Sequence, residues 1–555
     1  MLKPTNAASD NAMPPRRRFL LTSLLGAVGA AVMPAVAGAR EIAAHPPAAT
    51  GISSFELDEL TIADLQSAMA SGKFTSRSLA EKYLARIVDI DRHGPSLRSV
   101  IEMNPDALAI ADALDKERKS SRSRGPLHGV PVLIKDNIDT ADRLQTTAGS
   151  LALEGSRPLR DSFVVQKLRE AGAVILGKTN LSEWANIRSS HSTSGWSGRG
   201  GLTRNPYALD RNPCGSSSGS GAAVSANLCA LAVGTETDGS VVCPSSANGI
   251  VGLKPTLGLI SRAGIIPIAH SQDTAGPMAR TVRDAAILLN ALAGADPRDS
   301  ATADSTGKIS PDYTRFLDPN GLQGARIGVA RKYFGFNDLV DDLMTSVMEE
   351  MKGQGAVLVD PADLESHGKF DDTEFTVLLY ELKADLNAYL AGRPDAPVHS
   401  LKEIIEFNER NKDKEMPYFA QDTFIKAEAK GPLTSKEYLD ALEANHRLSR
   451  AEGIDGVMDK FHLDAIMAPT GGPAWLIDLI NGDHAAGGSS NAAAVAGYPD
   501  ITVPAGFIAG LPVGVSFFGR AWSEPVLLKI AYGFEQATKV RKPPKFLPSA
   551  QEGKS

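Results

Sequence analysis

The sequence predicts an α/β protein in which helices pack in layers against a β-sheet. Short apolar runs alternate with helical stretches along most of the chain, which is typical of this class. With 555 residues, of which 43% are hydrophobic and 22% charged, the chain is long enough to bury a large core. No internal repeat is visible, and the composition excludes a disordered or fibrous protein.

The first 39 residues are predicted to be an export signal. Arg16, Arg17 and Arg18 form a twin-arginine pattern that opens an uncharged stretch, residues 19–39, rich in glycine and alanine. Small residues allow cleavage after Ala37 or Ala39. A retained membrane anchor is the alternative, because the run approaches the ~20 apolar residues that a span needs. We expect a periplasmic or secreted protein, with the twin-arginine export machinery as a partner.

A linker over residues 40–55 precedes the first helices. Thr61 and Thr75 are predicted N-caps, and apolar residues between positions 79 and 88 follow at helical spacing. The short apolar runs that alternate with helical stretches are residues 130–134, 164–171, 173–176, 222–231 and 327–330. Residues 189–221 are crowded with glycine and serine, and structureless loops of that length are uncommon unless they serve a site.

Toward the C-terminus, residues 360–450 are charged and helix-like and carry no readable motif. We interpret them as a solvated helical cover. Residues 546–555 are expected to form a tail.

The charge and cysteine content exclude several classes of protein and site. Lys and Arg number 58 against 65 Asp and Glu, a formal net charge of −7, and no long basic block occurs. A dedicated nucleic-acid surface is therefore not expected. Cys214, Cys229 and Cys243 are too few for a disulfide framework and show no metal-ligand spacing with histidine. We expect neither a disulfide nor a metal site.

Residues 172–179 match the phosphate-loop expression G-x-x-x-x-G-K-T, which would indicate a nucleotide hydrolase. A phosphate loop needs a strand before its first glycine and a flexible turn after it. Here a helix-like run precedes Gly172, and strand-forming residues follow it. We therefore interpret Gly172 as the end of a helix and residues 173–176 as a buried strand.

Residues 215–219 match G-x-S-x-G, the nucleophile elbow of Ser-His-Asp hydrolases. Ser217 would then be the nucleophile, and the possible bases are His399, His462 and His484. The elbow requires a central strand before it, and two prolines in that approach disfavour one. This is the weaker serine hypothesis.

A lysine and two serine segments form the third constellation. Lys135 follows an apolar run, and burial would lower the pKa of its amine by disfavouring the charged form. Keeping the amine mostly neutral at pH 7 costs ~4–5 kcal/mol, which hydrogen bonds from serine hydroxyls help to offset. A glycine-containing turn at Thr237, Asp238 and Gly239 would let backbone N–H groups form an oxyanion hole beside Ser240 as nucleophile.

With these segments the sequence resembles the amidase signature hydrolases, whose hallmark is a Gly/Ser-rich stretch followed by a Gly-Ser nucleophile turn. The stretch is residues 214–220, the turn ends at Ser240, and residues 251–256 and 273–277 complete the block. Matches run from about residue 60 to residue 540. Among relatives the peptide amidases are the most similar, through residues 180–186, 194–197 and 494–499.

The resemblance implies a single large α/β domain, residues 56–545, with a central mixed β-sheet covered by helices. It also implies that Lys135 is the general base, Ser216 the bridging serine on a cis peptide bond, and Ser240 the acylated nucleophile. Positions 236, 238 and 242 hold Glu, Asp and Val, where the commonest family form has Asp, Gly and Arg. The oxyanion turn and its nearby charge are therefore expected to differ. Cys214 stands in place of a family glycine, for which the sequence offers no reason.

We therefore expect an exported, cofactor-free amidase that hydrolyses a carboxamide to acid and ammonia, with the C-terminal amide of a peptide as substrate. Ser217, Trp184, Trp196 and Tyr498 are candidate substrate-binding residues. Amidases of the same family that act on aryl, fatty or aliphatic amides are the first alternative. A component of an amidotransferase for charged tRNA is disfavoured by the export signal. From another class, a catalytically silent periplasmic binding protein stays open.

Overall fold

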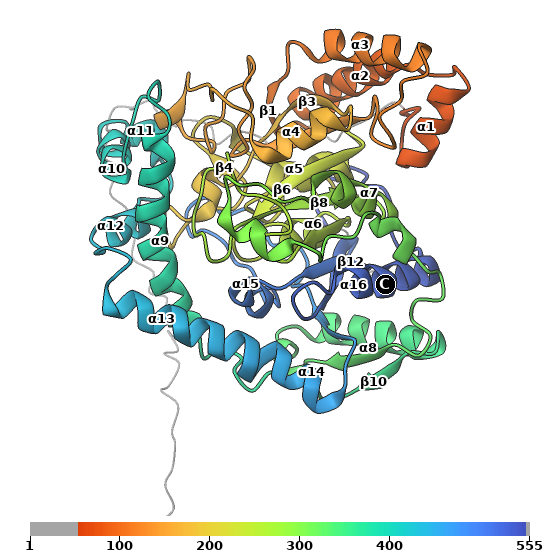
Figure 1. The fold of residues 1–555 in the computed structure, drawn as a ribbon, viewed down its shortest axis with the longest axis vertical. Coiled ribbons are helices and arrows are strands. Elements are labelled where there is room, and N and C mark those ends of the chain that lie inside the picture. The colour runs from red at the N-terminus through yellow and green to blue at the C-terminus, as the bar shows by residue number, and fades with distance from the viewer. Residues whose placement is uncertain (1–53, 551–555) are drawn as a thin grey trace, which may run out of the picture. The chain divides into compact units, whose positions relative to one another are not determined.

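An 11-stranded mixed β-sheet lies at the centre of the molecule (Figure 1). The computed structural model describes residues 54–550, so the predicted signal peptide and most of the predicted linker lie outside the described residues. The strands follow one another across the sheet in the order β1 (Val100–Met103), β3 (Val174–Thr179), β2 (Pro131–Lys135), β6 (Leu231–Glu236), β8 (Thr274–Ala279), β7 (Val251–Lys254), β12 (Asp500–Ile508), β13 (Leu511–Phe518), β11 (Ala465–Pro469), β9 (Arg326–Val329) and β10 (Val357–Val359).

The middle of the sheet is antiparallel and lies between two groups of parallel strands, and the edge strand β1 pairs antiparallel with β3. Strand β2 pairs in parallel with β3 and β6, and β9 pairs in parallel with β10 and β11. Between these groups, β12 and β13 form an antiparallel hairpin. Its two-residue turn holds Ala509 and Gly510 at positive φ, 50° and 78°, as tight hairpin turns require.

Helices cover the sheet, and its central strands are therefore buried. Val132, Leu133 and Ile134 of β2 are fully buried, as expected for a parallel strand covered on both faces. Helix α5 (Ser218–Ser225) contacts β2, β3 and β6, whereas α7 (Val282–Leu292) contacts β6, β7 and β8. Helices α6 (Val242–Ala247) and α16 (Glu524–Thr538) pack on β12 and β13. The predicted α/β class and mixed sheet are confirmed.

The predicted N-terminal helices are present. Helix α1 (Ile62–Ala70) begins at Thr61, and α2 (Ser76–Arg86) begins at Thr75; both N-caps form a capping box. Helix α2 continues through a π-helical turn, η1 (Ile87–Arg92), and packs on α3 (Ala107–Lys119). These helices gather beside the edge of the sheet that holds β1 and β3 (Figure 1).

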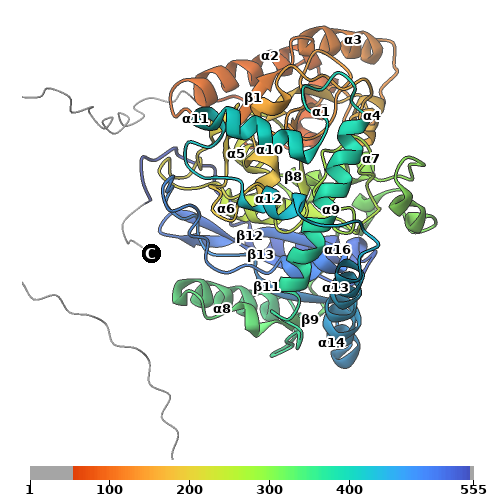
Figure 2. The same ribbon diagram turned by 90° about the vertical axis from the view of Figure 1, so that its left-hand side faces the viewer.

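The charged segment 360–450 is helical, as predicted, and runs along one side of the sheet (Figures 1 and 2). Its apolar side chains, including Leu379, Leu386 and Phe424, form a cluster of their own with Trp184. The helices from this segment onward to the next strand are α9 (Asp371–Ala391), α10 (Leu401–Arg410), α11 (Lys412–Glu415), α12 (Asp422–Glu428), α13 (Lys436–His446), η7 (Arg447–Ile454) and α14 (Asp455–Phe461).

The remaining predicted runs take different forms. Residues 164–171 lie almost entirely in α4 (Phe163–Glu170), and residues 173–176 lead into β3, as predicted. Residues 222–231 are divided between α5, a connecting loop and the first residue of β6. The Gly/Ser-rich segment 189–221 holds only two short strands, β4 (Trp196–Ser197) and β5 (Gly201–Leu202), before α5 begins. The other helices are α8 (Asp338–Gly353) and α15 (Asn491–Ala496).

Within residues 54–550, none of the helices has the length and apolar character that crossing a membrane requires.

Candidate active site

Lys135 ends strand β2 and is completely buried. Its Nζ lies 2.7 Å from Ser216 Oγ, 2.8 Å from Thr235 Oγ1 and 3.1 Å from the Thr235 carbonyl oxygen. Burial lowers the pKa of Lys135 to about 7, although Glu236 and Asp273 oppose this shift electrostatically. A substantial fraction of the amine is therefore neutral near neutral pH.

The three oxygen atoms around Lys135 Nζ suit a neutral amine. A neutral lysine has two N–H groups and one lone pair. The two oxygens of Thr235 can accept both N–H groups, which leaves the lone pair for the hydroxyl hydrogen of Ser216. Asn137 Nδ2 also donates to Thr235 Oγ1, at 3.0 Å, and so fixes that hydroxyl group. The arrangement is compatible with the prediction that a neutral Lys135 accepts the hydroxyl proton of Ser216.

Ser216 lies in the loop before α5, follows a cis peptide bond from Gly215, and is buried. Its carbonyl oxygen accepts a hydrogen bond from the Ser182 N–H at 3.1 Å. A Cβ at position 215 would lie 2.1 Å from Ser182 Oγ, so any larger residue there would force the Ser182 side chain to move. The glycine of the predicted Gly/Ser-rich motif therefore lets the loop pass close to the chain at Ser182.

Ser240 lies on the turn between β6 and α6, next to the loop of Ser216. The Ser217 N–H donates to the Ser240 carbonyl oxygen at 3.2 Å. Ser240 is 8% exposed, whereas Ser216 is 1% exposed. Within the described residues no hydrogen bond joins the two hydroxyl groups, so the step from Ser240 to Ser216 stays a prediction.

The turn that carries Ser240 is wrapped around the carboxylate of Glu236. One carboxylate oxygen accepts the Gly239 N–H at 2.9 Å, and the other accepts the N–H groups of Val241 and Val242 at 2.7 and 3.0 Å. Gly239 has φ +75°, a conformation that favours glycine. Sequence reasoning assigned no role to Glu236 beyond its departure from the family.

The predicted oxyanion hole therefore differs at one position. The Gly239 N–H faces Glu236 rather than an incoming oxyanion, because the turn folds back over that carboxylate. For the N–H groups of Thr237, Asp238 and Ser240, no acceptor lies within residues 54–550. The Thr237 hydroxyl donates to Asp273 at 2.5 Å, and the Ser490 hydroxyl donates to Asp238 at 2.6 Å. Burial raises the pKa of Asp238 to about 6.

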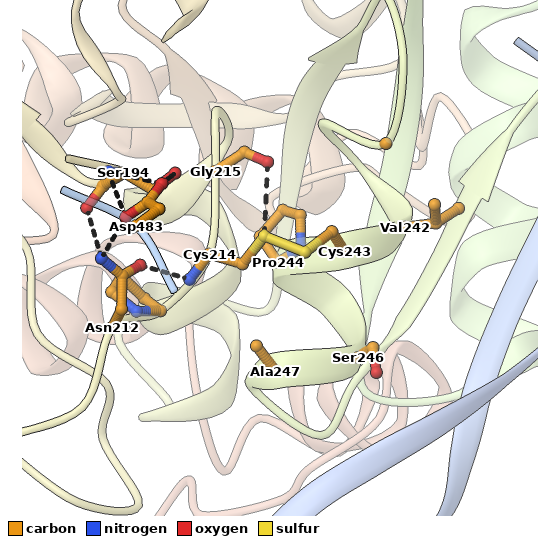
Figure 3. The surroundings of a disulfide bond; sticks show 12 residues. Ser194, Asn212, Cys214, Gly215, Val242, Cys243, Pro244, Ser246, Ala247 and Asp483 are labelled. Carbon is orange, nitrogen blue, oxygen red and sulfur yellow. Dashed lines mark hydrogen bonds between the residues drawn. A yellow bond between two sulfur atoms is a disulfide. The ribbon is translucent and has the colours of Figure 1, made fainter. Parts of the chain in front are cut away.

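Cys214 and Cys243 form a disulfide, which corrects the expectation that the chain has none (Figure 3). Their Cα atoms are 6.0 Å apart because the loop before α5 packs against the first turn of α6. Cysteine number and spacing gave no sign of this pairing. Cys229 is a free, buried thiol, and burial raises its pKa to about 12.

A cavity of about 260 Å³ reaches the carboxyl end of β6. One wall is apolar and includes Ala185 and residues 265–268. Asn137 and residues 235–237 also line the cavity, on the side of Lys135. Helix α9 adds Asp385, Ala388 and Tyr389, so the segment predicted as a solvated cover also lines this cavity.

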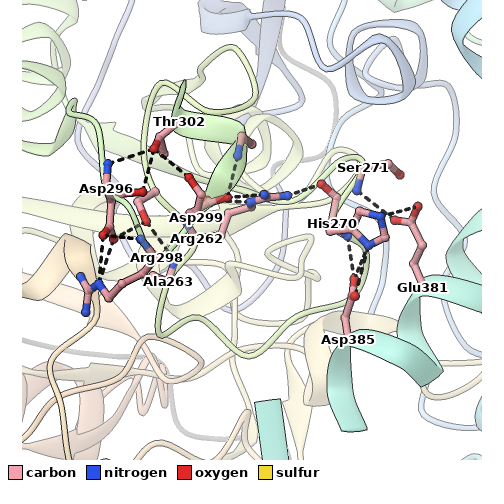
Figure 4. A network of polar contacts seen from close by, with 12 residues as sticks. Arg262, Ala263, His270, Ser271, Asp296, Arg298, Asp299, Thr302, Glu381 and Asp385 are labelled. Atoms are coloured by element: carbon pink, nitrogen blue, oxygen red, sulfur yellow. Dashed lines mark hydrogen bonds and ion pairs between the residues drawn. The ribbon is translucent and has the colours of Figure 1, made fainter. Parts of the chain in front are cut away.

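Most charged groups of the cavity wall are paired within the protein (Figure 4). Glu236 and Asp273 also line the cavity, and they accept hydrogen bonds from neutral groups of the chain. Arg262 Nε donates to Asp299 at 2.9 Å, and Arg298 Nε donates to Asp296 at 3.0 Å. His270 Nδ1 lies 2.9 Å from Asp385, and that hydrogen bond raises the pKa of His270. The wall thus offers mainly neutral surface to a ligand.

His270, Glu381 and Asp385 offer ligand atoms that lie within 4.8 Å of one another, a spacing compatible with a metal ion. Both ring nitrogens of His270 already face carboxylates, since Nε2 lies 3.4 Å from Glu381. We interpret the group as an ion-paired histidine that joins the loop before β8 to α9.

The four candidate substrate-binding residues lie in different places. Ser217 is fully buried, and its hydroxyl donates to the Thr235 carbonyl at 3.0 Å. Trp184 lines a second cavity of about 10 Å³ that shares Asn137 and residues 266–268 with the first. Trp196 is buried against Phe419, and the Tyr498 hydroxyl donates to Asp455 at 2.8 Å. Their roles in binding stay predictions.

The two alternative motifs lie in other structural contexts. Helix α4 precedes Gly172 and strand β3 follows it, which reverses the order of a phosphate loop. Lys178 is buried in β3, where it donates to Thr146 at 2.8 Å. The histidines considered as partners of Ser217 lie before α10, at the end of α14 and in a loop beside Asp478, as His399, His462 and His484 respectively.

The chain is similar to known proteins over most of its length. The family model described as Amidase matches residues 78–528. The crystal structure of the native peptide amidase from Stenotrophomonas maltophilia superimposes with a TM-score of 0.85, at 52% identity over 89% of this chain and 100% of that one. A probable amidase of Arabidopsis thaliana is 44% identical over 89% of this chain and 93% of its own length. A glutamyl-tRNA(Gln) amidotransferase component of Chloroflexus aurantiacus is 35% identical over 87% of this chain and 97% of its own length.

Proposed function

The chain belongs to the amidase family, and we propose that this amidase hydrolyses the C-terminal carboxamide of a peptide to a carboxylic acid and ammonia. One observation carries the chemistry: the buried amine of Lys135, with a pKa lowered to about 7, lies 2.7 Å from the hydroxyl oxygen of Ser216. An amine that is partly neutral at neutral pH is a general base, so the relay needs no histidine.

The acylation step follows from this relay. Lys135 accepts the hydroxyl proton of Ser216, and Ser216 takes the proton of Ser240 while Ser240 Oγ attacks the carboxamide carbon. The negative charge that develops on the carbonyl oxygen is stabilised by free N–H groups of the turn at Thr237 and Asp238. The tetrahedral intermediate then collapses, the C–N bond breaks, and the relay returns the proton to the leaving nitrogen as ammonia departs.

Deacylation uses the same groups in the opposite direction. A water molecule attacks the ester carbon of the Ser240 acyl-enzyme, and its proton passes to the relay. When the ester bond breaks, the relay returns a proton to Ser240 Oγ, and the free acid leaves. The base is thereby restored to its neutral form.

Two observations favour a peptide amide as the substrate. The cavity beside the turn presents an apolar wall at Ile266, Pro267 and Ile268, and most of its charged groups are paired within the protein. Such a site suits an uncharged acyl group better than an ionised one. The similarity to a peptide amidase, at 52% identity, supports the same class.

Product analysis tests the proposal. The purified enzyme is incubated with matched panels of peptide amides, the corresponding free peptides, anilides and fatty amides, and ammonia and the acid product are quantified. We expect ammonia and acid from the peptide amides at the highest kcat/KM. Ser240→Ala is the control, because any ammonia formed by that variant reports a contaminant.

Each alternative predicts a different pattern. Higher kcat/KM on anilides or fatty amides would assign the enzyme to another amidase class. Ammonia transfer to charged tRNA would favour the amidotransferase. Inertness toward every amide, together with ligand binding, would favour the silent binding protein.

A further inference from the structure

The two segments that carry the proposed serines are joined covalently. Cys214 lies just before the Gly215–Ser216 peptide, and Cys243 lies in the first turn of the helix that follows Ser240. Their disulfide connects positions separated by 29 residues in sequence, with Cα atoms 6.0 Å apart. The bond between Cys214 and Cys243 (Figure 3) therefore ties the loop that continues into Ser216 to the segment that follows Ser240.

On one side, the backbone of Cys243 is hydrogen-bonded to the turn that carries Ser240. The Cys243 N–H donates to the Gly239 carbonyl at 2.8 Å, so Cys243 shares a backbone turn with Ser240. The same turn is fixed from beneath by Glu236, which accepts the N–H groups of Val241 and Val242. A displacement of Cys243 would consequently be transmitted to Ser240.

On the other side, Cys214 is held in an unusual backbone conformation. Its φ is 58°, in the left-handed region that costs non-glycine residues energy unless the surroundings impose it. The Cys214 N–H donates to Asn212 Oδ1 at 2.8 Å, and Asn212 Nδ2 donates to the Ser194 carbonyl at 2.9 Å. The disulfide additionally fixes the side chain of Cys214.

Besides the disulfide, only two direct hydrogen bonds among the described residues join residues 213–217 to residues 240–248. Asn248 Nδ2 donates to the Pro213 carbonyl at 2.8 Å, and the Ser217 N–H donates to the Ser240 carbonyl at 3.2 Å. Each such hydrogen bond exchanges with water and adds little net stability, whereas the disulfide stays closed until a reductant opens it.

We propose that the Cys214–Cys243 disulfide is a positioning element of the active site, which holds Ser216 close enough to Ser240 for proton transfer. The inference rests on the proposed function. When a dithiol reduces the bond, the S–S bond breaks, each cysteine gains a proton as a thiol, and the dithiol is oxidised to its cyclic disulfide. The loop of Ser216 can then move away from α6.

The expected effect is on kcat rather than on substrate binding. A displacement of ~1 Å between reacting groups can cost ~10²-fold in rate. The cavity that binds the acyl group is lined largely by residues 262–274 and helix α9, which the bond does not tether. Disulfides persist in oxidising compartments, so the predicted export would couple activity to location.

The test compares the oxidised enzyme, the same enzyme after dithiothreitol, and the double variant Cys214→Ala/Cys243→Ala. N-acetyl-phenylalaninamide is the substrate, alkylation followed by mass spectrometry counts the thiols, and circular dichroism checks the fold. Reduction and the double variant should each lower kcat at least tenfold, with KM changed less than twofold and the pH midpoint unchanged. Reoxidation should restore the reduced wild-type enzyme. Cys229→Ala, which removes the free thiol, should respond to reduction as wild type does.

Three results would overturn the inference: a reduced enzyme that keeps kcat within twofold, a double variant that does so, or a double variant that is unfolded. The last would make the bond a global staple instead of a local positioning element. If dithiothreitol does not open the bond, the double variant alone decides. If the oxidised wild type hydrolyses no amide, the proposed function fails, and the outcome is distinct from a failure of this inference.

Discussion

In the proposed mechanism a buried lysine takes the place of the histidine of more familiar serine hydrolases, and the environment of Lys135 supports this role. Lys135 loses hydration on every side, and its three hydrogen-bonding neighbours are neutral oxygens rather than carboxylates. Glu236 and Asp273 favour its charge only from a distance, so burial dominates and the pKa falls to about 7. A pKa near 7 is the value at which the proposed general base would transfer protons most efficiently at neutral pH.

The lowered pKa of Lys135 predicts the pH dependence of activity. Because the folded pKa of Lys135 is lowered to about 7 and the neutral form is the base, kcat/KM should rise as pH increases through 7 and level off above it. A pH series of initial rates on one peptide amide measures the midpoint. A rise that continues toward pH 10 would mean that Lys135 keeps an ordinary pKa.

Substitution separates basicity from charge at the same residue. Lys135→Ala should lower kcat by at least the ~10²–10⁴-fold typical of proton-transfer groups. Lys135→Arg should fail as badly, because a guanidinium stays protonated and cannot accept the proton of Ser216. His399→Gln serves as the matched control and should keep normal rates. An arginine variant that retained more than a tenth of wild-type kcat would show that position 135 supplies charge instead.

At the scale of elements, the nucleophile turn depends on a carboxylate placed beneath it. Glu236 ends β6, and its two oxygens receive three N–H groups of the turn and of the first residues of α6. This explains why an acidic residue stands at the end of that strand. It also explains why Gly239 does not contribute its N–H to the oxyanion.

Glu236→Gln tests this arrangement. Replacing one oxygen by an NH₂ group leaves buried N–H donors facing another donor, and each such loss costs ~1–3 kcal/mol. We expect lower stability in urea unfolding and a kcat reduced at least tenfold, because the turn that holds Ser240 loosens. Glu524→Gln is the control: Glu524 is also buried and accepts the Thr256 N–H at 2.6 Å, but away from the turn. Equal kcat losses in both variants would contradict a specific role.

Sequence pattern predicted the local elements better than their contacts. The N-caps at Thr61 and Thr75, the helix before Gly172 and the strand after it follow from short-range rules of capping and periodicity. The grouping of Lys135 with Ser216 required the family resemblance. The disulfide and the Glu236 contacts depend on how two loops pack, and no spacing rule for cysteine or glutamate reveals that.

At the scale of the molecule, the sheet brings distant segments together at the site. Lys135 ends β2, and the turn of Ser240 follows β6. These two strands are parallel neighbours, so their carboxyl ends lie side by side. Helix α9, far along the chain, completes the cavity with Asp385, Ala388 and Tyr389. The charged, helix-like sequence of α9 predicts a solvated surface and gives no sign of this second role.

Export concerns the chain as a whole, and its signal lies outside the described residues. Changing Arg16 and Arg17 to lysine should leave the precursor in the cytoplasm, because the paired arginines are the feature that the export machinery reads. Immunoblots of cytoplasmic and exported fractions measure the distribution. Normal export of the lysine variant would remove the twin-arginine assignment, while leaving the proposed chemistry untouched.

In the proposed mechanism Ser240, rather than Ser217, carries the acyl group, and mapping of the acyl-enzyme distinguishes the two serines. An amide-directed covalent probe is reacted with wild type, Ser240→Ala and Ser217→Ala, and mass spectrometry of the digested protein locates the label. We expect a label on Ser240 in wild type and Ser217→Ala, and none in Ser240→Ala. A label on Ser217 would contradict it.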